Sequence, residues 1–209
     1  MFDGRPWKYI SETEWTRVYK DGDAILYDSK FLRNGLEVSA EFVRGRWSSL
    51  SAAQRLDFAQ AFSAKPNVTP EDEHILDFLM EVGEPYIWST IAILLPRHRD
   101  KDRVLAFLLE RTGEEGEHKA GFFQATRLMG DNRAIPALRA AYDGYRKKLL
   151  GGTEPPVKFD HFSYLSCCKA LWALEGSANY KDAIEEFLKS DDKAVCRFAE
   201  IMLFGERPR

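Results

Sequence analysis

From about residue 49 to residue 204, hydrophobic side chains recur at every third or fourth position, in short segments separated by Gly, Pro and Asp. This period places apolar side chains on one face of a helix, so the pattern predicts a run of about nine α-helices. We expect them at residues 49–65, 70–82, 85–95, 101–111, 117–129, 133–148, 160–175, 180–189 and 192–204. Short helices joined by short turns are typical of stacked αα-hairpins.

The clearest helix start is the string Thr69-Pro70-Glu71-Asp72. A hydroxyl at the N-cap, a proline at the first helical position and acids near the positive end of the helix dipole all favour a helix that begins here. The apolar face of this helix is predicted to consist of Ile75, Phe78, Leu79 and Val82.

The first 47 residues follow a different pattern, because hydrophobic and polar side chains alternate there, most clearly over residues 36–44. The dipeptides Asp21-Gly22 and Asn34-Gly35 tolerate the positive φ angles of tight hairpin turns. We therefore predict a three-stranded antiparallel β-meander over residues 15–44. A helix over residues 36–44 is the alternative, because several of their apolar side chains also share a helical face.

The helical part of the chain repeats itself. Val104 and Phe107 align with Ile135 and Leu138 at an offset of 31 residues. A glycine also follows three of the helices, at spacings of 46 and 29 residues: Gly130, Gly176 and Gly205. The longer spacing predicts an insertion near residues 146–159, which contain a Gly-Gly and a Pro-Pro pair.

The most informative string runs from Leu128 to Leu138 and reads Leu-Met-Gly-Asp-Asn-Arg-Ala-Ile-Pro-Ala-Leu. Gly130 can adopt the left-handed conformation that ends one helix, and Asp131 can cap the next one. Pro136 lacks an N–H group, so it must lie in the first turn of that helix. The string resembles the G-D-x-R-A-I-P-x-L core of bacterial HEAT-like repeats, also called phycobilisome-lyase-type repeats.

The resemblance covers one repeat well and about four loosely. It implies a mainly α fold, a HEAT-like α-solenoid in which αα-hairpins form a right-handed superhelix, and most often the binding of partner proteins. We expect residues 48–209 to form this repeat domain and residues 1–47 to form the β-meander. The meander would cap the first helical pair, because a terminal repeat otherwise leaves a hydrophobic face in water.

Composition narrows the class of protein. The 209 residues are 44% hydrophobic and 13% aromatic, which is enough for a folded core. The net charge of -3 argues against nonspecific binding of nucleic acid, which needs an excess of Lys and Arg. The sequence shows no secretory signal and no apolar run near the ~20 residues of a membrane span, and its three cysteines cannot form a disulfide framework. We therefore expect a cytoplasmic protein.

The candidates for catalytic or metal chemistry are weak. Glu114 and His118 could share a helix face, but they lie at a helix start, where acids are favoured in any case. Cys167 and Cys168 have no nearby cation in sequence to activate them. Asp160, His161 and Ser163 lie too close in sequence to converge from one helix, and Gly151-Gly152 lacks the flanking strand and helix of a phosphate loop. We expect no catalytic residue, no metal and no cofactor.

Two basic runs, Arg97–Arg103 and Arg146–Lys148, could form a ridge that binds acids or phosphates. The simpler interpretation is a solvated turn or helix end, and Asp100 and Asp102 dilute the first run.

In a HEAT-like stack the second helix of each hairpin lines the concave face. Those helices begin near Glu71, Asp102, Arg133 and Lys181, and their exposed positions carry both signs of charge. A mixed-charge surface suits a folded protein better than a polyanion. The predicted partner-binding residues are Asp77, Arg103, Arg139, Asp143, Arg146 and Glu185.

The sequence thus favours a non-catalytic protein-interaction module or adaptor, such as a bacterial regulatory or immunity protein. The alternative is a HEAT-like enzyme such as a DNA glycosylase or a bilin lyase, which a continuous positive groove with an exposed Trp would favour. The sequence gives no indication of a small-molecule ligand.

Overall fold

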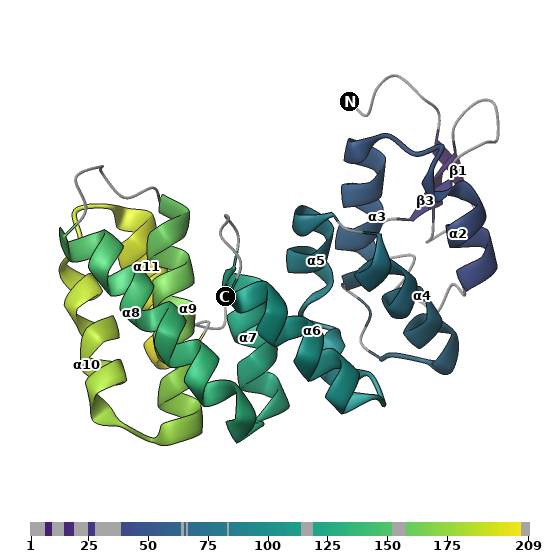
Figure 1. Ribbon diagram of the computed structural model, residues 1–209. Coiled ribbons are helices and arrows are strands. Elements are labelled where there is room, and N and C mark those ends of the chain that lie inside the picture. Colours follow the sequence, from purple (N-terminus) through teal and green to yellow (C-terminus); the bar gives the residue numbers. More distant parts are fainter. Residues whose placement is uncertain are drawn as a thin grey trace. The chain divides into compact units, whose positions relative to one another are not determined.

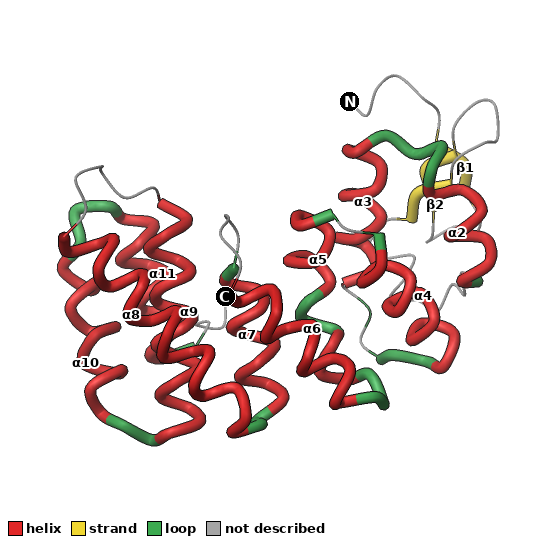
Figure 2. Tube along the Cα trace, viewed as in Figure 1, coloured by secondary structure: helices red, strands yellow, loops and turns green. Residues whose placement is uncertain are grey.

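The protein is mainly helical in the computed structural model (Figures 1 and 2), which describes residues 7–9, 15–18, 25–27, 39–63, 65, 67–82, 84–113, 119–151 and 158–205. Contacts between Cα atoms divide the chain into two units, Met1–Arg99 and Asp100–Arg209. The boundary expected near residue 47 lies within the first unit. Among the described residues, no helix is long and apolar enough to cross a membrane.

Three short strands open the first unit: β1 (Trp7–Tyr9), β2 (Trp15–Val18) and β3 (Ile25–Tyr27). They pair antiparallel in the order β1-β2-β3, with Tyr9 opposite Trp15 and Val18 opposite Ile25. Strand β3 lies against helix α3 (Ala52–Ser63).

The prediction of a strand over residues 36–44 is wrong for residues 40–44, because they belong to helix α2 (Ala40–Trp47). Residues 36–38 lie outside the described residues. Two contacts fix the start of the helix: the Ser39 hydroxyl accepts a hydrogen bond from the Phe42 N–H, and the Ala40 N–H donates to Oε1 of Glu71. Its buried side chains, Ala40, Val43 and Trp47, follow the helical period rather than the alternating one.

Helices α3, α4 (Pro70–Glu81) and α5 (Pro85–Ile91) complete the first unit, with a 3-10 helix η1 (Leu95–Arg97). The expected start of α4 is confirmed: Thr69 is the N-cap, and Thr69 and Asp72 form a capping box. The helix expected over residues 85–95 is shorter, because Pro96 has no N–H to continue it and the chain tightens into 3-10 bonds. The core of this unit includes Trp47, whose ring meets Phe58 and Phe78 edge to face at 6.0 and 5.8 Å.

The second unit consists of helices α6 (Lys101–Gly113), α7 (Ala120–Met129), α8 (Ile135–Gly151), α9 (Lys158–Glu175), α10 (Ala178–Glu185) and α11 (Lys193–Phe204). Two 3-10 helices, η2 (Asn132–Ala134) and η3 (Glu186–Lys189), precede α8 and follow α10. Together with α3, α4 and α5, this makes nine α-helices after Ser49 in the described part of the chain, the number expected.

Helix α9 packs against most of the second unit, and its contacts include α7 and α11. Helix α6 contacts α8, and both α8 and α10 pack on α9 (Figure 1). Buried side chains from α6, α7, α8 and α9 form one core cluster: Leu105, Phe123, Ala134, Leu138, Cys167, Ala170 and Leu171.

The turn between α7 and α8 has the geometry expected from its sequence. Gly130 has φ 68° and ψ 21°, in the left-handed region, and its N–H donates to the carbonyls of Thr126 and Arg127. Asp131 accepts a hydrogen bond from the Arg133 N–H at 2.9 Å, and Pro136 lies in the first turn of α8.

The insertion expected over residues 146–159 stays a prediction, because residues 152–157 lie outside the described residues. Residues 146–151 form the last turns of α8, and residues 158 and 159 begin α9. These two helices have 17 and 18 residues, longer than their neighbours in the unit, and their length accounts for most of the wider repeat spacing.

Candidate functional site

A groove lies between α8, α9 and α10 in the second unit, with a cavity volume of about 520 Å³. Its size is within the range of about 300–1,000 Å³ in which proteins enclose small ligands or protruding side chains. The residues that line it are Tyr142, Arg146, Leu149, Leu150, Tyr164, Ser177, Asn179, Tyr180, Asp182, Ala183, Glu186 and Phe187.

The floor of the groove is aromatic. The ring of Tyr142 stacks on Tyr164 with 5.4 Å between centroids, and it meets Tyr180 edge to face at 5.2 Å. Phe187 packs on the other side of Tyr164 at 5.7 Å. Burial raises the pKa of Tyr164 and of Tyr180, so both phenols stay neutral at physiological pH. Such rings supply rigid contact area with a polar tip.

The rim of the groove carries charges of both signs on opposite helices. Arg146 is exposed on α8, whereas Asp182 and Glu186 are exposed at the end of α10 and the start of η3. Within the described residues, no hydrogen bond or ion pair engages the side chain of Arg146, Asp182 or Glu186. Leu150 also lines the groove, and 74% of this apolar residue is exposed to solvent. Solvated charges around an apolar floor are typical of a protein-binding surface.

Of the six predicted partner-binding residues, the groove contains only Arg146. Arg139 and Asp143 are exposed on the same helix, at spacings that share its face with Arg146. Arg139, however, donates two hydrogen bonds to Glu175, at 2.9 and 2.6 Å, and thereby fixes α8 to the end of α9.

The remaining three predicted residues lie elsewhere. Glu185, on α10, pairs with Lys181 at 2.7 Å one turn away. Asp77 belongs to the first unit, where it lies 3.4 Å from Nε2 of His98. Arg103 is exposed on α6, where its backbone N–H donates to Oδ1 of Asp100 at 3.0 Å.

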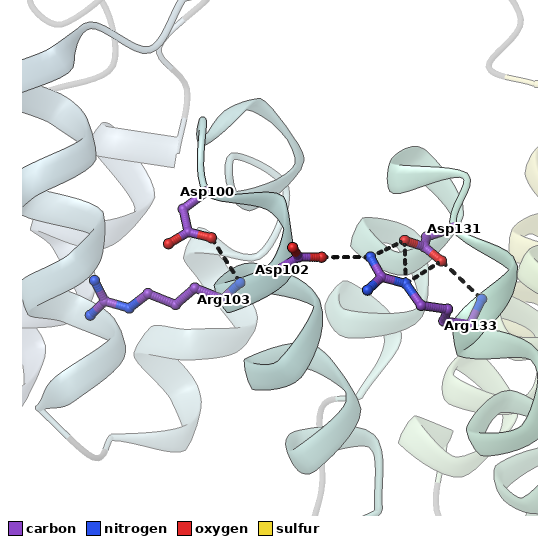
Figure 3. A network of polar contacts seen from close by, with 5 residues as sticks. All are labelled: Asp100, Asp102, Arg103, Asp131 and Arg133. Atoms are coloured by element: carbon purple, nitrogen blue, oxygen red, sulfur yellow. Dashed lines mark hydrogen bonds and ion pairs between the residues drawn. The ribbon is translucent and has the colours of Figure 1, made fainter.

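A network of polar contacts joins the start of α6 to the turn before α8 (Figure 3). The guanidinium of Arg133 binds Asp131 through Nε and Nη2, and Nη2 also donates to Oδ1 of Asp102 at 2.7 Å. These contacts lower the pKa of Asp131 and raise the pKa of Arg133 through hydrogen bonds. The network is intramolecular and satisfies its own charges, so it joins neighbouring hairpins and presents no open site.

Two arginines of the first basic run, Arg97 and Arg99, make contacts within the first unit, whereas Lys101 and Arg103 belong to the second unit. Arg97 donates to the Lys65 carbonyl at 3.1 Å. Arg99 binds the buried carboxylate of Glu73 through Nε at 2.6 Å and through its backbone N–H at 3.0 Å. Hydrogen bonds from Arg99 outweigh the effect of burial on Glu73 and lower its pKa. These contacts give Arg97 and Arg99 a structural role.

The cysteine and histidine candidates also have structural surroundings. Cys167 and Cys168 are fully buried, and burial raises the pKa of both thiols, that of Cys168 to about 12. His161 packs edge to face on Phe187, while Asp160 pairs with Lys148 at 2.8 Å. Glu114 and His118 lie outside the described residues, and within them no group of three or more His, Cys, Asp or Glu side chains could hold a metal.

Sequence reasoning missed most of the groove. The sequence pattern assigned no role to Tyr164, Tyr180, Asp182 or Glu186. The signal available was a group of four tyrosines within residues 142–180: Tyr142, Tyr145, Tyr164 and Tyr180. It does not show which tyrosines meet across three helices.

No protein-family model, no curated protein and no solved structure matches this sequence.

Proposed function

We propose that this protein is a non-catalytic protein-interaction module of the HEAT-like repeat kind, which binds a folded partner through the groove between α8 and α10. Three observations of the second unit support the repeat interpretation: the left-handed turn at Gly130, the cap at Asp131 and the offset of 31 residues between the hydrogen-bonded Asp102 and Arg133. In such a stack α8 and α10 are the second helices of their hairpins.

The observation that carries the proposal is the combination of an aromatic floor with a rim of unpaired charges. Tyr142, Tyr164 and Tyr180 form a rigid, partly buried platform. Arg146 stands on one side of it and Asp182 and Glu186 on the other. Interfaces are enriched in Tyr and Arg at their energetic centres, and opposed charges set orientation and specificity.

This arrangement specifies the chemistry of the partner. One apolar side chain of the partner would enter the groove and contact the tyrosine rings and Leu150. An acidic residue next to it would meet Arg146, and a basic residue on the opposite side would meet Asp182 and Glu186. A polyanion such as nucleic acid would be attracted by Arg146 but repelled by Asp182 and Glu186.

The alternative of a HEAT-like enzyme receives no support from this groove. A nucleic-acid enzyme of this kind would need a continuous positive surface with an aromatic residue to engage an extruded base. The described residues that line the groove include no Trp and carry two acids against one base. We further propose a cytoplasmic location and a regulatory or immunity role, which fit the free cysteines and the mild negative charge.

Site-specific photocrosslinking tests the proposal. A photoreactive amino acid at Leu150, in the groove, is compared with the same group at Leu128, an exposed leucine on α7. We expect a distinct protein adduct from cells of the native host at position 150 only, and the purified partner should then bind the unmodified chain with an affinity that Arg146→Glu weakens. Equal adducts at both positions, or a partner indifferent to Arg146→Glu, would contradict the proposal.

A further inference from the structure

A second pocket lies between α7, α9 and α11, with a volume of about 440 Å³. Gln124 and Arg127 line it from α7, Ser166 and Lys169 from α9, and Ile201, Met202 and Gly205 from α11 and its end. Gln124 and Arg127 are three residues apart on α7, and Ser166 and Lys169 are three residues apart on α9. Each pair therefore lies on one face of its helix, the face that lines the pocket.

The described residues that line the pocket include two cations, Arg127 and Lys169, and no Asp or Glu. Within the described residues, no ion pair or hydrogen bond joins Arg127 or Lys169 to a carboxylate. The ammonium of Lys169 instead lies 4.1 Å from the ring centroid of Trp172, an arrangement that stabilises a cation without neutralising it.

Four other basic side chains of the same unit do pair with carboxylates. Lys148 pairs with Asp160, Arg139 with Glu175, Lys181 with Glu185 and Arg197 with Glu200. At Arg127 and Lys169 the fold instead brings two like charges together, which disfavours both. Burial and the repulsion from Arg127 lower the pKa of Lys169. An anion placed between the two cations would remove this repulsion.

The remaining lining residues indicate what accompanies the negative charge. The Ser166 hydroxyl and the Gln124 amide can donate hydrogen bonds to an oxyanion, and Ser166 is only 5% exposed. Ile201 and Met202 provide an apolar wall, and the flexible methionine side chain adapts to different shapes. A pocket that combines a cationic end with an apolar wall suits an amphipathic ligand.

We propose that the pocket between α7, α9 and α11 binds a small organic anion, whose carboxylate or phosphate group lies between Arg127 and Lys169 and whose short apolar part contacts Ile201 and Met202. This site is separate from the proposed protein-binding groove, which lies between α8 and α10.

Methionine-methyl NMR of the whole chain tests the proposal, because Met202 lines the pocket and Met80 is buried in the first unit. Hexanoate is the probe, hexanol is its neutral analogue, and inorganic phosphate tests the anionic group alone. We expect hexanoate to shift the Met202 signal saturably and to leave Met80 unchanged. Hexanol should bind at least about tenfold more weakly, because it cannot form charge-assisted hydrogen bonds, and phosphate should bind more weakly than hexanoate.

Variants identify the groups responsible. Arg127→Gln and Lys169→Gln should each weaken hexanoate binding about tenfold or more, while Arg197→Gln on α11 should not change it. An unchanged helical circular-dichroism spectrum shows that each variant is folded. Glu206→Gln is included because Glu206 directly follows Gly205 in sequence.

Four results of the hexanoate experiments would overturn the proposal. They are the absence of a saturable Met202 shift, equal binding of hexanoate and hexanol, unchanged affinity in both pocket variants, and binding of hexanoate only when Glu206 is replaced. The last result would show that the cations serve a carboxylate of the chain itself. Much tighter binding of a single-stranded oligonucleotide than of hexanoate at the same residues would equally contradict a small-molecule site.

Discussion

Arg133 donates a hydrogen bond to Asp102 at 2.7 Å, and the two residues are 31 positions apart, the same offset that relates the apolar pairs of their helices. Their contact joins the start of α6 to the turn before α8 (Figure 3). Thr69, Asp100 and Asp131 are also 31 residues apart, and their side chains accept backbone hydrogen bonds at the starts of α4, α6 and η2. The spacing of 31 residues is therefore shared by the caps of three helices.

The first prediction concerns the pH dependence of this contact. Hydrogen bonds from Arg133 hold the pKa of Asp131 below its ordinary value of 3.8. A carboxyl with a depressed folded pKa contributes stability that is complete above 3.8 and is lost as the pH falls through the folded pKa. NMR titration of the carboxyl carbon should show Asp131 titrating below 3.8, and Arg133→Gln should return it toward that value. An unchanged midpoint in Arg133→Gln would show that the guanidinium does not set it.

The second prediction separates the two arginines of α8. Arg139→Gln should lower the melting temperature and raise the pKa of Glu175, because it removes two hydrogen bonds to a carboxylate that is only 13% exposed. Arg146→Gln, on the same helix, should leave both quantities unchanged. Thermal unfolding followed by circular dichroism and a carboxyl titration check this. Equal effects of the two substitutions would mean that Arg139 has no special structural role.

The third prediction compares two leucines of α8. Leu138 is fully buried in the core of the second unit, so Leu138→Ala should lower the free energy of unfolding by about 2–5 kcal/mol. Leu150 is 74% exposed, and Leu150→Ala should change it by less than about 0.5 kcal/mol. Urea titration measures both. A comparable cost for the two variants would contradict the packing described for α8.

The fourth prediction concerns thiol chemistry. Burial raises the pKa of Cys167 and Cys168, and Cys168 has a pKa of about 12, so very little of either thiol is ionised at pH 8. Cys196 is partly exposed and should react with iodoacetamide at least about 100-fold faster than either. Peptide mass spectrometry resolves the three sites. Rapid alkylation of Cys167 or Cys168 in the folded chain would contradict this prediction and make that cysteine a candidate nucleophile.

The sequence was informative where local chemistry decides the structure. The helix that begins after Thr69, the turn at Gly130 and the first-turn position of Pro136 follow from backbone preferences that neighbouring residues determine. Residues 40–44 were predicted as a strand because, over so short a segment, the same apolar side chains fit both the alternating pattern of a strand and the period of a helix. The contact that decides the matter, from the Ala40 N–H to Glu71, spans 31 residues.

The candidate sites could be predicted only in part, for a related reason. A pattern of charges shows which residues can be exposed, but not which of them find a partner. Arg139 and Arg146 look equivalent in sequence, yet one is held by Glu175 and the other lines the groove. The cations of the second pocket, Arg127 and Lys169, come from different hairpins and are 42 positions apart. Only the packing of α7 against α9 brings them together.

The most direct test of the central claim is the affinity of the crosslinked partner, once purified, for charge-reversed variants of the groove. We predict that Arg146→Glu and Glu186→Lys each weaken binding at least about tenfold, while the matched reversal Arg197→Glu on α11 leaves it within about twofold. Isothermal titration calorimetry gives these constants directly. Affinities unchanged by both groove variants, or lowered equally by Arg197→Glu, would contradict the assignment of the groove between α8 and α10 as the protein-binding site.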